Sequence, residues 1–128
     1  MAHVAMRSWL DWRGASPDLR FDADLVLEEI LSNLIKYAWP QGGEHRIVLE
    51  LDEHEDRLVL RFKDDGLPFD PRSVPAPEFT DKLEDRTTGK LGLHLVRRVA
   101  DHFDYRREHG HNLLTVRLRI PLDDRQKA

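Results

Sequence analysis

Residues 22–38, with the sequence DADLVLEEILSNLIKYA, decide the fold of the chain. Apolar side chains recur there at helical spacing and form one stripe, namely Leu27, Ile30, Leu31, Leu34 and Ala38. Polar side chains at i, i+4, i+7 and i+8 share another side of the same helix, namely Glu29, Asn33, Lys36 and Tyr37. Asp22 is the predicted N-cap, and Pro40 stops the helix. The segment therefore predicts an amphipathic helix with a cluster of polar side chains on one face.

Two other segments predict helices. Residues 1–14 carry apolar side chains at helical spacing and end at Gly14. Trp9 and Trp12 are expected in the core rather than on a partner surface, because large aromatic side chains near a terminus usually dock it. After the glycines of a later loop, residues 93–103 are amphipathic, and the side chains expected to point inward are Leu95, Val96, Val99 and Phe103.

The remaining regular segments predict two β-hairpins. Residues 45–52 and 57–64 alternate apolar and polar side chains on either side of a charged turn. Residues 104–108 and 113–120 do the same around the turn HGHN. Helices that are segregated from hairpins predict an α+β fold, a two-layer sandwich of a mostly antiparallel sheet with its helices packed on one face.

The composition predicts one domain over residues 1–128. Hydrophobic residues make up 40% and charged residues 34%, which is typical of a globular chain, and the tail 122–128 is expected to fray. The net charge of −4 argues against direct binding of nucleic acid. No apolar run reaches the roughly 18 to 20 residues that span a bilayer, so we expect no membrane association and a cytoplasmic location. The absence of cysteine excludes disulfides and thiolate metal sites.

Glu29 and Asn33 are the first candidates for chemistry. A carboxylate and a carboxamide one turn apart can aim at the same point. The Asn oxygen is a neutral ligand that suits Mg²⁺, which takes its other ligands from water and phosphates. The Glu carboxylate can accept a proton from a hydroxyl or a water that attacks such a phosphate. The alternative is a solvated helix face without chemistry.

The DDG turn after the second strand of the first hairpin is the second candidate site. Asp64 can accept a hydrogen bond from an exocyclic amine such as that of adenine, and Gly66 lets a ligand approach the backbone. D-x-G is also a common turn. Residues 67–88 follow, with four prolines and little periodicity, and a segment of this length in a small domain is typical of a lid.

A glycine-rich loop and a strand threonine complete the candidates. Residues 87–93, TTGKLGL, precede a helix, so their N–H groups can cradle a phosphate, and Arg86 and Lys90 add positive charge. Glycine also serves plain loop geometry. Thr115 interrupts an apolar strand, although threonine is common in strands.

The order of these motifs resembles a known family. The segments 28–33 (EEILSN), 64–70 (DDGLPFD), 88–96 (TGKLGLHLV) and 113–118 (LLTVRL) resemble the Bergerat-type (GHKL) ATP-binding fold of gyrase, histidine kinases and MutL proteins. The small size and the Glu at the head of the first box are similar to the anti-sigma factor serine kinases of bacterial partner-switching systems. The resemblance covers roughly residues 22–120.

The resemblance implies roles for the residues of the first helix box. Glu29 would act as the catalytic base, and Asn33 would coordinate Mg²⁺. Lys36 would contact phosphate and Tyr37 would cover the adenine, as the matching residues do in histidine kinases.

The resemblance also implies an ATP site in the later motifs. Asp64 would bind the adenine amine with Gly66 beside it, and Thr115 would support the adenine through water. The glycine-rich box would wrap the phosphates, and its nucleotide-binding residues are Arg86, Thr88, Gly89, Lys90, Leu91, Gly92 and Leu93. The family commonly has glycine where Lys90 stands, so this box either makes a charge contact with the phosphates or binds nucleotide more weakly.

The activity that the resemblance implies is ATP-dependent phosphorylation of a Ser or Thr on an anti-sigma factor antagonist with the STAS fold. The same chain would sequester a sigma factor and form a homodimer. Two alternatives stay open on the residues alone. One is a partner-binding switch protein without catalysis, and the other is a hydrolytic ATPase of the same fold.

Overall fold

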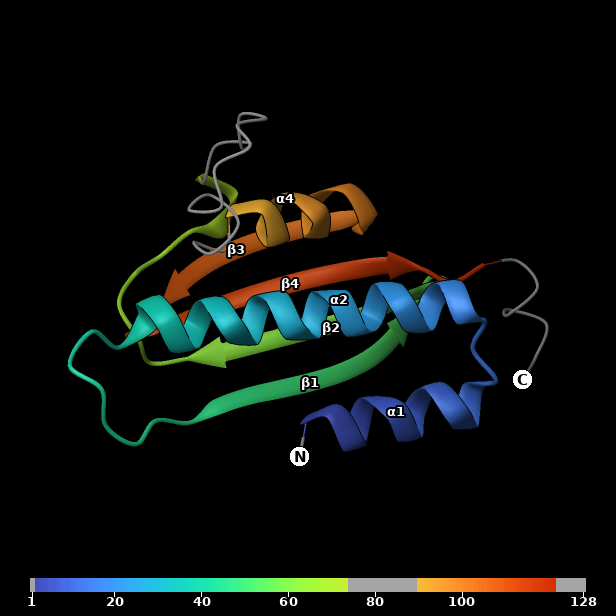
Figure 1. Cartoon of the computed structure of the whole chain (residues 1–128), viewed down its shortest axis with the longest axis horizontal. Helices are drawn as coiled ribbons and strands as arrows, with labels where there is room; N and C mark the ends of the chain where they lie inside the picture. The colour runs from blue at the N-terminus through green and yellow to red at the C-terminus, as the bar shows by residue number, and fades with distance from the viewer. Residues whose placement is uncertain (1, 74–89, 122–128) are drawn as a thin grey trace.

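A computed structural model of the chain describes residues 2–73 and 90–121 (Figure 1). Its elements, in chain order, are α1 (Ala2–Arg13), α2 (Pro17–Asn33), the π-helical turn η1 (Leu34–Ala38), β1 (Ile47–His54), β2 (Arg57–Asp64), the 3₁₀ turn η2 (Pro71–Ser73), α4 (Lys90–Val99), β3 (His102–Glu108) and β4 (His111–Arg119). The α+β prediction is confirmed.

The strands form one antiparallel sheet in the order β1-β2-β4-β3. The central pair is β2 and β4, and its register places Asp64 opposite Asn112. In Figure 1, α2 runs along the sheet, α4 lies beside α2, and α1 lies toward β1. Apolar side chains of these helices join those of the sheet in one core, so the helices cover a single face, as predicted.

The central strands carry the inner half of this core. The core side chains on them recur at every second residue, and they are Leu58, Leu60 and Phe62 on β2 and Val116 and Leu118 on β4. Val59 is also buried, but it does not belong to this core. The first hairpin closes through Glu55 and Asp56, whose φ angles are 49° and 62°. Two residues at positive φ match the twist of the flanking strands, and this explains the tight connection. Both predicted hairpins are confirmed.

The prediction of Asp22 as the N-cap of the long helix is wrong. The helix α2 begins at Pro17, and the hydroxyl oxygen of Ser16 accepts a hydrogen bond from the backbone N–H of Leu19 at 3.3 Å. Proline suits this first helical position because its fixed φ is helical and it lacks a donor. Asp22 lies inside the helix, where burial and the nearby Asp18 raise the pKa of its carboxyl group.

The predicted burial also fails at particular apolar residues. Trp9 packs against the core, but Trp12 is 80% exposed, because it lies on the outer side of α1. The helix α4 starts at Lys90, so Gly92 lies inside its first turn rather than before it. Leu95 is 39% exposed, and Phe103 belongs to β3 rather than to the helix.

Among the residues that the structure describes, no helix combines the length and the apolar character that crossing a membrane requires. Of the predicted lid, residues 67–73 belong to the described part of the chain, whereas residues 74–88 lie outside it. The predicted tail, residues 122–128, also lies outside the described residues.

Candidate functional site

The carboxylate of Glu29 lies against the first turn of α4. A Cβ atom placed on Gly92 would stand 1.6 Å from Oε2 of Glu29, so the absence of a side chain at Gly92 makes room for the carboxylate. The first turn of a helix presents N–H groups without intrahelical partners and the positive end of the helix dipole. Glu29 and Gly92, which are far apart in sequence, therefore meet at a place that attracts negative charge.

Asn33 is the last residue of α2, and it is 5% exposed. Its Nδ2 donates a hydrogen bond to the backbone carbonyl of Glu29 at 2.7 Å. Its Oδ1 is buried and has no hydrogen-bond partner among the described residues. A buried polar atom without a partner costs about 1–3 kcal/mol. The cost makes Oδ1 of Asn33 the clearest acceptor for a ligand at this site.

Lys36 and Tyr37 lie on η1, where the regular helix gives way to a π turn, a feature common at functional sites. Both side chains are exposed, whereas Asn33 is buried, so the predicted polar residues do not share one solvated face. The ring of Tyr37 lies 6.0 Å from the ring of Phe69, centroid to centroid. Tyr37 is thereby placed beside the segment that follows the DDG turn.

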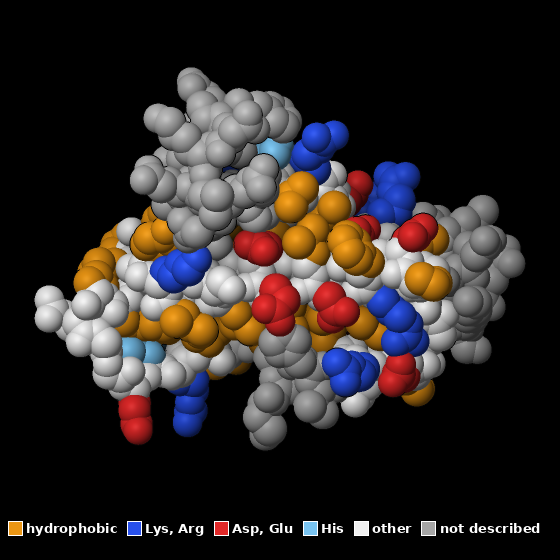
Figure 2. Space-filling view, in the orientation of Figure 1, with side chains coloured by type: hydrophobic (Ala, Val, Ile, Leu, Met, Phe, Trp, Pro, Cys, Tyr) orange, Lys and Arg blue, Asp and Glu red, His pale blue; other side chains and the backbone are white. Residues whose placement is uncertain are grey.

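Figure 2 shows acidic side chains over α2 with hydrophobic side chains beside them. The exposed acidic residues of this helix are Asp18, Asp24 and Glu28. These three carboxylates therefore lie on a solvated helix face, as the alternative interpretation expected. Asn33 does not lie on that solvated face, because it is buried.

Asp64 ends β2 and is 3% exposed. Its Oδ1 accepts hydrogen bonds from the backbone N–H of Gly66 at 2.8 Å and from Nδ2 of Asn112 at 3.0 Å. A Cβ atom on Gly66 would lie 2.5 Å from the Cβ of Ala38, so packing requires glycine there. The backbone N–H of Leu67 donates to the carbonyl of Ala38 at 2.9 Å, which ties this turn to the end of η1.

A cavity separates the helices from the ends of β2 and β4. It is lined by Ile30, Asn33, Leu34, Asp64, Phe69, Pro71, Leu93, Tyr105, Asn112 and Leu114. Three residues predicted from separate motifs, Asn33, Asp64 and Leu93, thus meet in one place. No sequence motif identifies Asn112 or Tyr105, because no local pattern pairs Asn112 with Asp64 across 48 positions.

The structure does not place Thr115 in this cavity. Leu114 and Val116 are buried on the inner face of β4, so Thr115 points to the opposite face of the sheet. There it lines a separate hollow with Arg61 and Lys63. The prediction that Thr115 supports a base is therefore corrected, and the strand residue beside Asp64 is Asn112.

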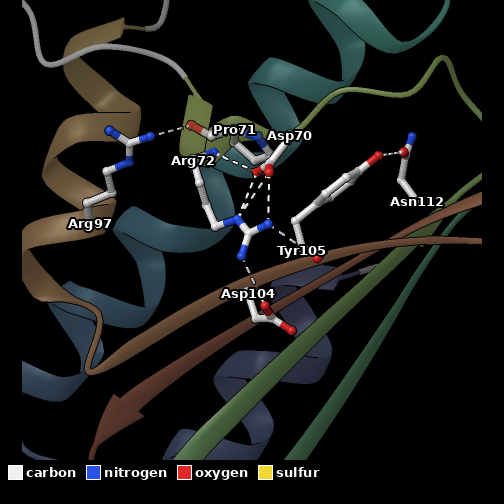
Figure 3. Close-up of polar contacts among 7 residues, drawn as sticks. All are labelled: Asp70, Pro71, Arg72, Arg97, Asp104, Tyr105 and Asn112. Atoms are coloured by element: carbon white, nitrogen blue, oxygen red, sulfur yellow. Dashed lines mark hydrogen bonds and ion pairs between the residues drawn. The ribbon is translucent and has the colours of Figure 1, made fainter.

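Figure 3 shows how residues that follow the DDG turn are held against β3 and α4. Arg72 contacts Asp70 at 2.8 Å and Asp104 at 3.1 Å. Arg97 of α4 donates a hydrogen bond to the carbonyl of Pro71 at 2.9 Å. The hydrogen bond from Arg72 lowers the pKa of the Asp70 carboxyl group. The described start of the predicted lid is thus fixed at one wall of the cavity.

Part of the predicted phosphate-binding box lies outside the described residues. Arg86, Thr88 and Gly89 lie outside the described residues. Lys90 and Leu91 begin α4, and their side chains lie outside the described part. Among the residues described, no group of three or more His, Asp or Glu side chains could hold a metal ion.

The fold and the site together define a class of protein. The chain is a two-layer α+β domain, and its candidate site lies where α2 and α4 meet the C-terminal end of β2 and the start of β4. Residues 1–119 match the family described as the histidine kinase-like ATPase domain, and the chain belongs to that family. The predicted resemblance is confirmed.

The chain is similar to known kinases in sequence and in fold. The chain is 31% identical over 116 residues to the serine/threonine-protein kinase BtrW of Bordetella bronchiseptica, which covers 91% of this chain and 78% of that protein. It is 27% identical over 84 residues to the serine-protein kinase RsbW of Listeria innocua, which covers 62% of this chain and about half (54%) of that protein. The histidine kinase domain of a blue-light activated histidine kinase from Erythrobacter litoralis EL346 has a similar fold, with a TM-score of 0.53 and 18% identity over 84% of this chain and 50% of that one.

Proposed function

We propose that this protein is an ATP-dependent protein serine/threonine kinase that phosphorylates an anti-sigma factor antagonist and sequesters a sigma factor. The observation that carries the proposal is the pairing of Glu29, set against the start of α4, with the uncommitted buried oxygen of Asn33 one turn away. Two of the relatives named above, BtrW and RsbW, are protein kinases for serine or threonine. The residue types and their placement support transfer of a phosphoryl group.

In this proposal the nucleotide occupies the cavity and the adjoining surface of η1. Asp64 accepts a hydrogen bond from the exocyclic amine of adenine, and Gly66 lets the base approach the backbone. Tyr37 covers the base, beside Phe69, and Lys36 contacts phosphate. The glycine-rich box from Thr88 to Leu93, with Arg86, wraps the phosphates, and Gly92 and Leu93 already stand beside Glu29 and the cavity.

The site also fits Mg²⁺. Oδ1 of Asn33 is a neutral oxygen that is buried and has no partner among the described residues, and such an oxygen suits a hard cation that takes its remaining ligands from phosphates and water. When bound, Mg²⁺ would neutralise charge on the phosphates of ATP.

Glu29 is the proposed general base. Its carboxylate accepts the proton of a serine or threonine hydroxyl while the hydroxyl oxygen forms a bond to the γ-phosphorus and the bond to the ADP oxygen breaks. The positive end of the α4 dipole, beside the carboxylate, would stabilise negative charge that develops on the phosphates. Gly92 permits this arrangement by having no side chain.

The partners follow from the same proposal. The phosphoryl acceptor is an antagonist protein of the STAS fold, which competes with a sigma factor until phosphorylation dismisses it. The protein acts as a homodimer in the cytoplasm, without direct contact with nucleic acid or membrane.

Calorimetry of ATP binding with and without Mg²⁺ tests the nucleotide site. We expect Asp64→Ala to weaken ATP binding at least about tenfold, since a hydrogen bond to a charged group is lost. Asn33→Ala should remove the Mg²⁺ dependence, and Thr115→Val, on the other face of the sheet, should bind as the wild type does. Failure of the wild type to bind at millimolar ATP would contradict the proposal.

Transfer of γ-labelled phosphate to a STAS-fold antagonist tests the chemistry. Glu29→Gln should bind ATP normally and lose about 10²- to 10⁴-fold in transfer rate, as expected for a general base. Undiminished transfer would refute the role of Glu29. Phosphate release at a useful turnover rate without any protein acceptor would identify a hydrolytic ATPase instead.

A further inference from the structure

The side-chain amide of Asn112 is the most fully bonded polar group at the cavity. Asn112 is 4% exposed and begins the inward-facing row of β4. Its Nδ2 donates to Oδ1 of Asp64 at 3.0 Å and to the carbonyl of Leu67 at 2.9 Å, with a longer contact to the carbonyl of Gly66 at 3.4 Å. The amide therefore joins the DDG turn to the neighbouring strand.

These partners leave the amide only one orientation. A carboxylate oxygen and two carbonyl oxygens surround Nδ2, and all of them are acceptors, so the NH₂ group must face them. Oδ1 of Asn112 then faces the hydroxyl group of Tyr105, which donates to it at 2.5 Å (Figure 3). Tyr105 reaches this position from the edge strand β3 and fixes the amide from its other end.

The two carboxylate oxygens of Asp64 therefore differ in their hydrogen bonding. Oδ1 accepts from the N–H of Gly66 and from Asn112. No described residue donates a hydrogen bond to Oδ2, although Asp64 lines the cavity. The carboxylate is thereby held by one oxygen and offers the other as an acceptor.

We infer that Asn112 and Tyr105 are positioning residues that make the site select a 6-aminopurine over a 6-oxopurine nucleotide. The inference rests on the proposed function, in which Asp64 receives the base. A fixed acceptor pairs with the amino group of adenine, whereas the 6-oxo group of hypoxanthine or guanine brings a second acceptor against it. Rejection by unpaired polar groups is a strong source of specificity.

The selectivity depends on the carboxylate staying in place. Without Asn112, Oδ1 of Asp64 keeps one donor, and the side chain can turn toward a different partner. The carbonyls of Leu67 and Gly66 also lose a donor, so the turn that carries Asp64 loosens. Tyr105→Phe removes a single hydroxyl group and leaves the ring in the cavity wall, so it weakens the same arrangement with less disturbance.

Calorimetry with ATP and with inosine triphosphate, on the same protein samples, measures this selectivity. For the wild type we expect ATP to bind about 10- to 100-fold more tightly, the range given by one hydrogen bond to a charged group. Asn112→Ala should reduce this ratio to about threefold or less, and Tyr105→Phe should reduce it by a smaller factor of about three. Thr115→Val, on the same strand but the opposite face, should keep the ratio of the wild type.

The ratio separates positioning from a merely structural role. A structural defect weakens both nucleotides by the same factor, so an unchanged ratio in both Asn112→Ala and Tyr105→Phe would overturn the inference. If Asn112→Ala does not fold, judged by its thermal unfolding, the result for Tyr105→Phe decides. If the wild type binds ATP but the variants keep its ratio of ATP to inosine triphosphate affinity, only this inference is refuted. If the wild type binds neither nucleotide, the proposed function is refuted as well.

Discussion

The two ends of the candidate site differ in how completely their polar groups are bonded. At the end of β2, Oδ1 of Asp64 has two donors, and the amide of Asn112 bonds through both its nitrogen and its oxygen. At the end of α2, Oδ1 of Asn33 is buried without a partner among the described residues. The first end is organised before any ligand arrives. The second end is left unsatisfied, as expected where a ligand completes the bonding.

The difference indicates that the two ends of the site bind different parts of the nucleotide in the proposed kinase. A bonded, rigid end suits recognition of a base, because fixed acceptors discriminate between similar ligands. An unsatisfied end suits phosphates and cations, because the ligand relieves a cost that the free protein carries. The following predictions test this contrast.

Gly92→Ala should have the largest effect. The added Cβ would stand 1.6 Å from Oε2 of Glu29, so the carboxylate must leave the start of α4. We expect a loss of about 100-fold or more in phosphoryl transfer, the typical contribution of a general base. Kinetics of transfer from ATP measure it. The double variant Gly92→Ala with Glu29→Ala should transfer no more slowly than Glu29→Ala alone, and an additive loss would show that Gly92 acts elsewhere.

Gly66→Ala should disturb the bonded end. A Cβ there would stand 2.5 Å from the Cβ of Ala38 and 2.8 Å from its carbonyl oxygen. We expect a decrease of about 1–3 kcal/mol in the free energy of unfolding, typical of overpacking, together with weaker ATP binding. Urea denaturation and calorimetry provide the two measurements. Normal stability with normal ATP affinity would contradict a role of close packing at Gly66 in holding this turn.

Asn33→Leu, at the unsatisfied end, should change the free energy of unfolding in the opposite direction to Gly66→Ala. Leucine has a similar shape and removes a buried oxygen that has no partner among the described residues, so the free protein should gain about 1 kcal/mol of stability. The same variant should lose the Mg²⁺ dependence of ATP binding. Thermal unfolding without nucleotide, beside the binding measurement, reveals whether stability and ligand binding are opposed at this position. A destabilised variant would contradict the contrast between the two ends.

Acidification should have the smallest effect on stability, and it acts on the ion pair between Asp70 and Arg72 beside the cavity wall. The hydrogen bond from Arg72 lowers the pKa of the Asp70 carboxyl group below its ordinary value. A lowered pKa in the folded state contributes stability above the unfolded pKa, and this contribution is lost as the pH falls through the folded pKa. Between about pH 5 and pH 2, Arg72→Gln should therefore lose less stability than the wild type. Arg98→Gln, an exposed substitution on α4, serves as the control, and an identical pH profile for Arg72→Gln would exclude a contribution from this pair.

The features that could be predicted from the sequence are those with a local cause. Alternation along residues 57–64 places Leu58 and Leu60 inward because strand side chains have a period of two. The apolar stripe of α2 likewise identifies its buried side, including Leu27 and Ile30. The order of the motifs identifies the family, since four segments in one order are far more specific than each alone.

Tertiary structure decided the features that depend on contacts between distant segments. The register of β2 with β4 pairs Asp64 with Asn112 and turns Thr115 to the other face, and a shift by one residue would reverse both. The approach of α4 to α2 places Gly92 against Glu29. These relations follow from how the core packs across the whole chain. Local sequence therefore determined which residues could take part in a site, and packing of the helices on the sheet decided which of them meet.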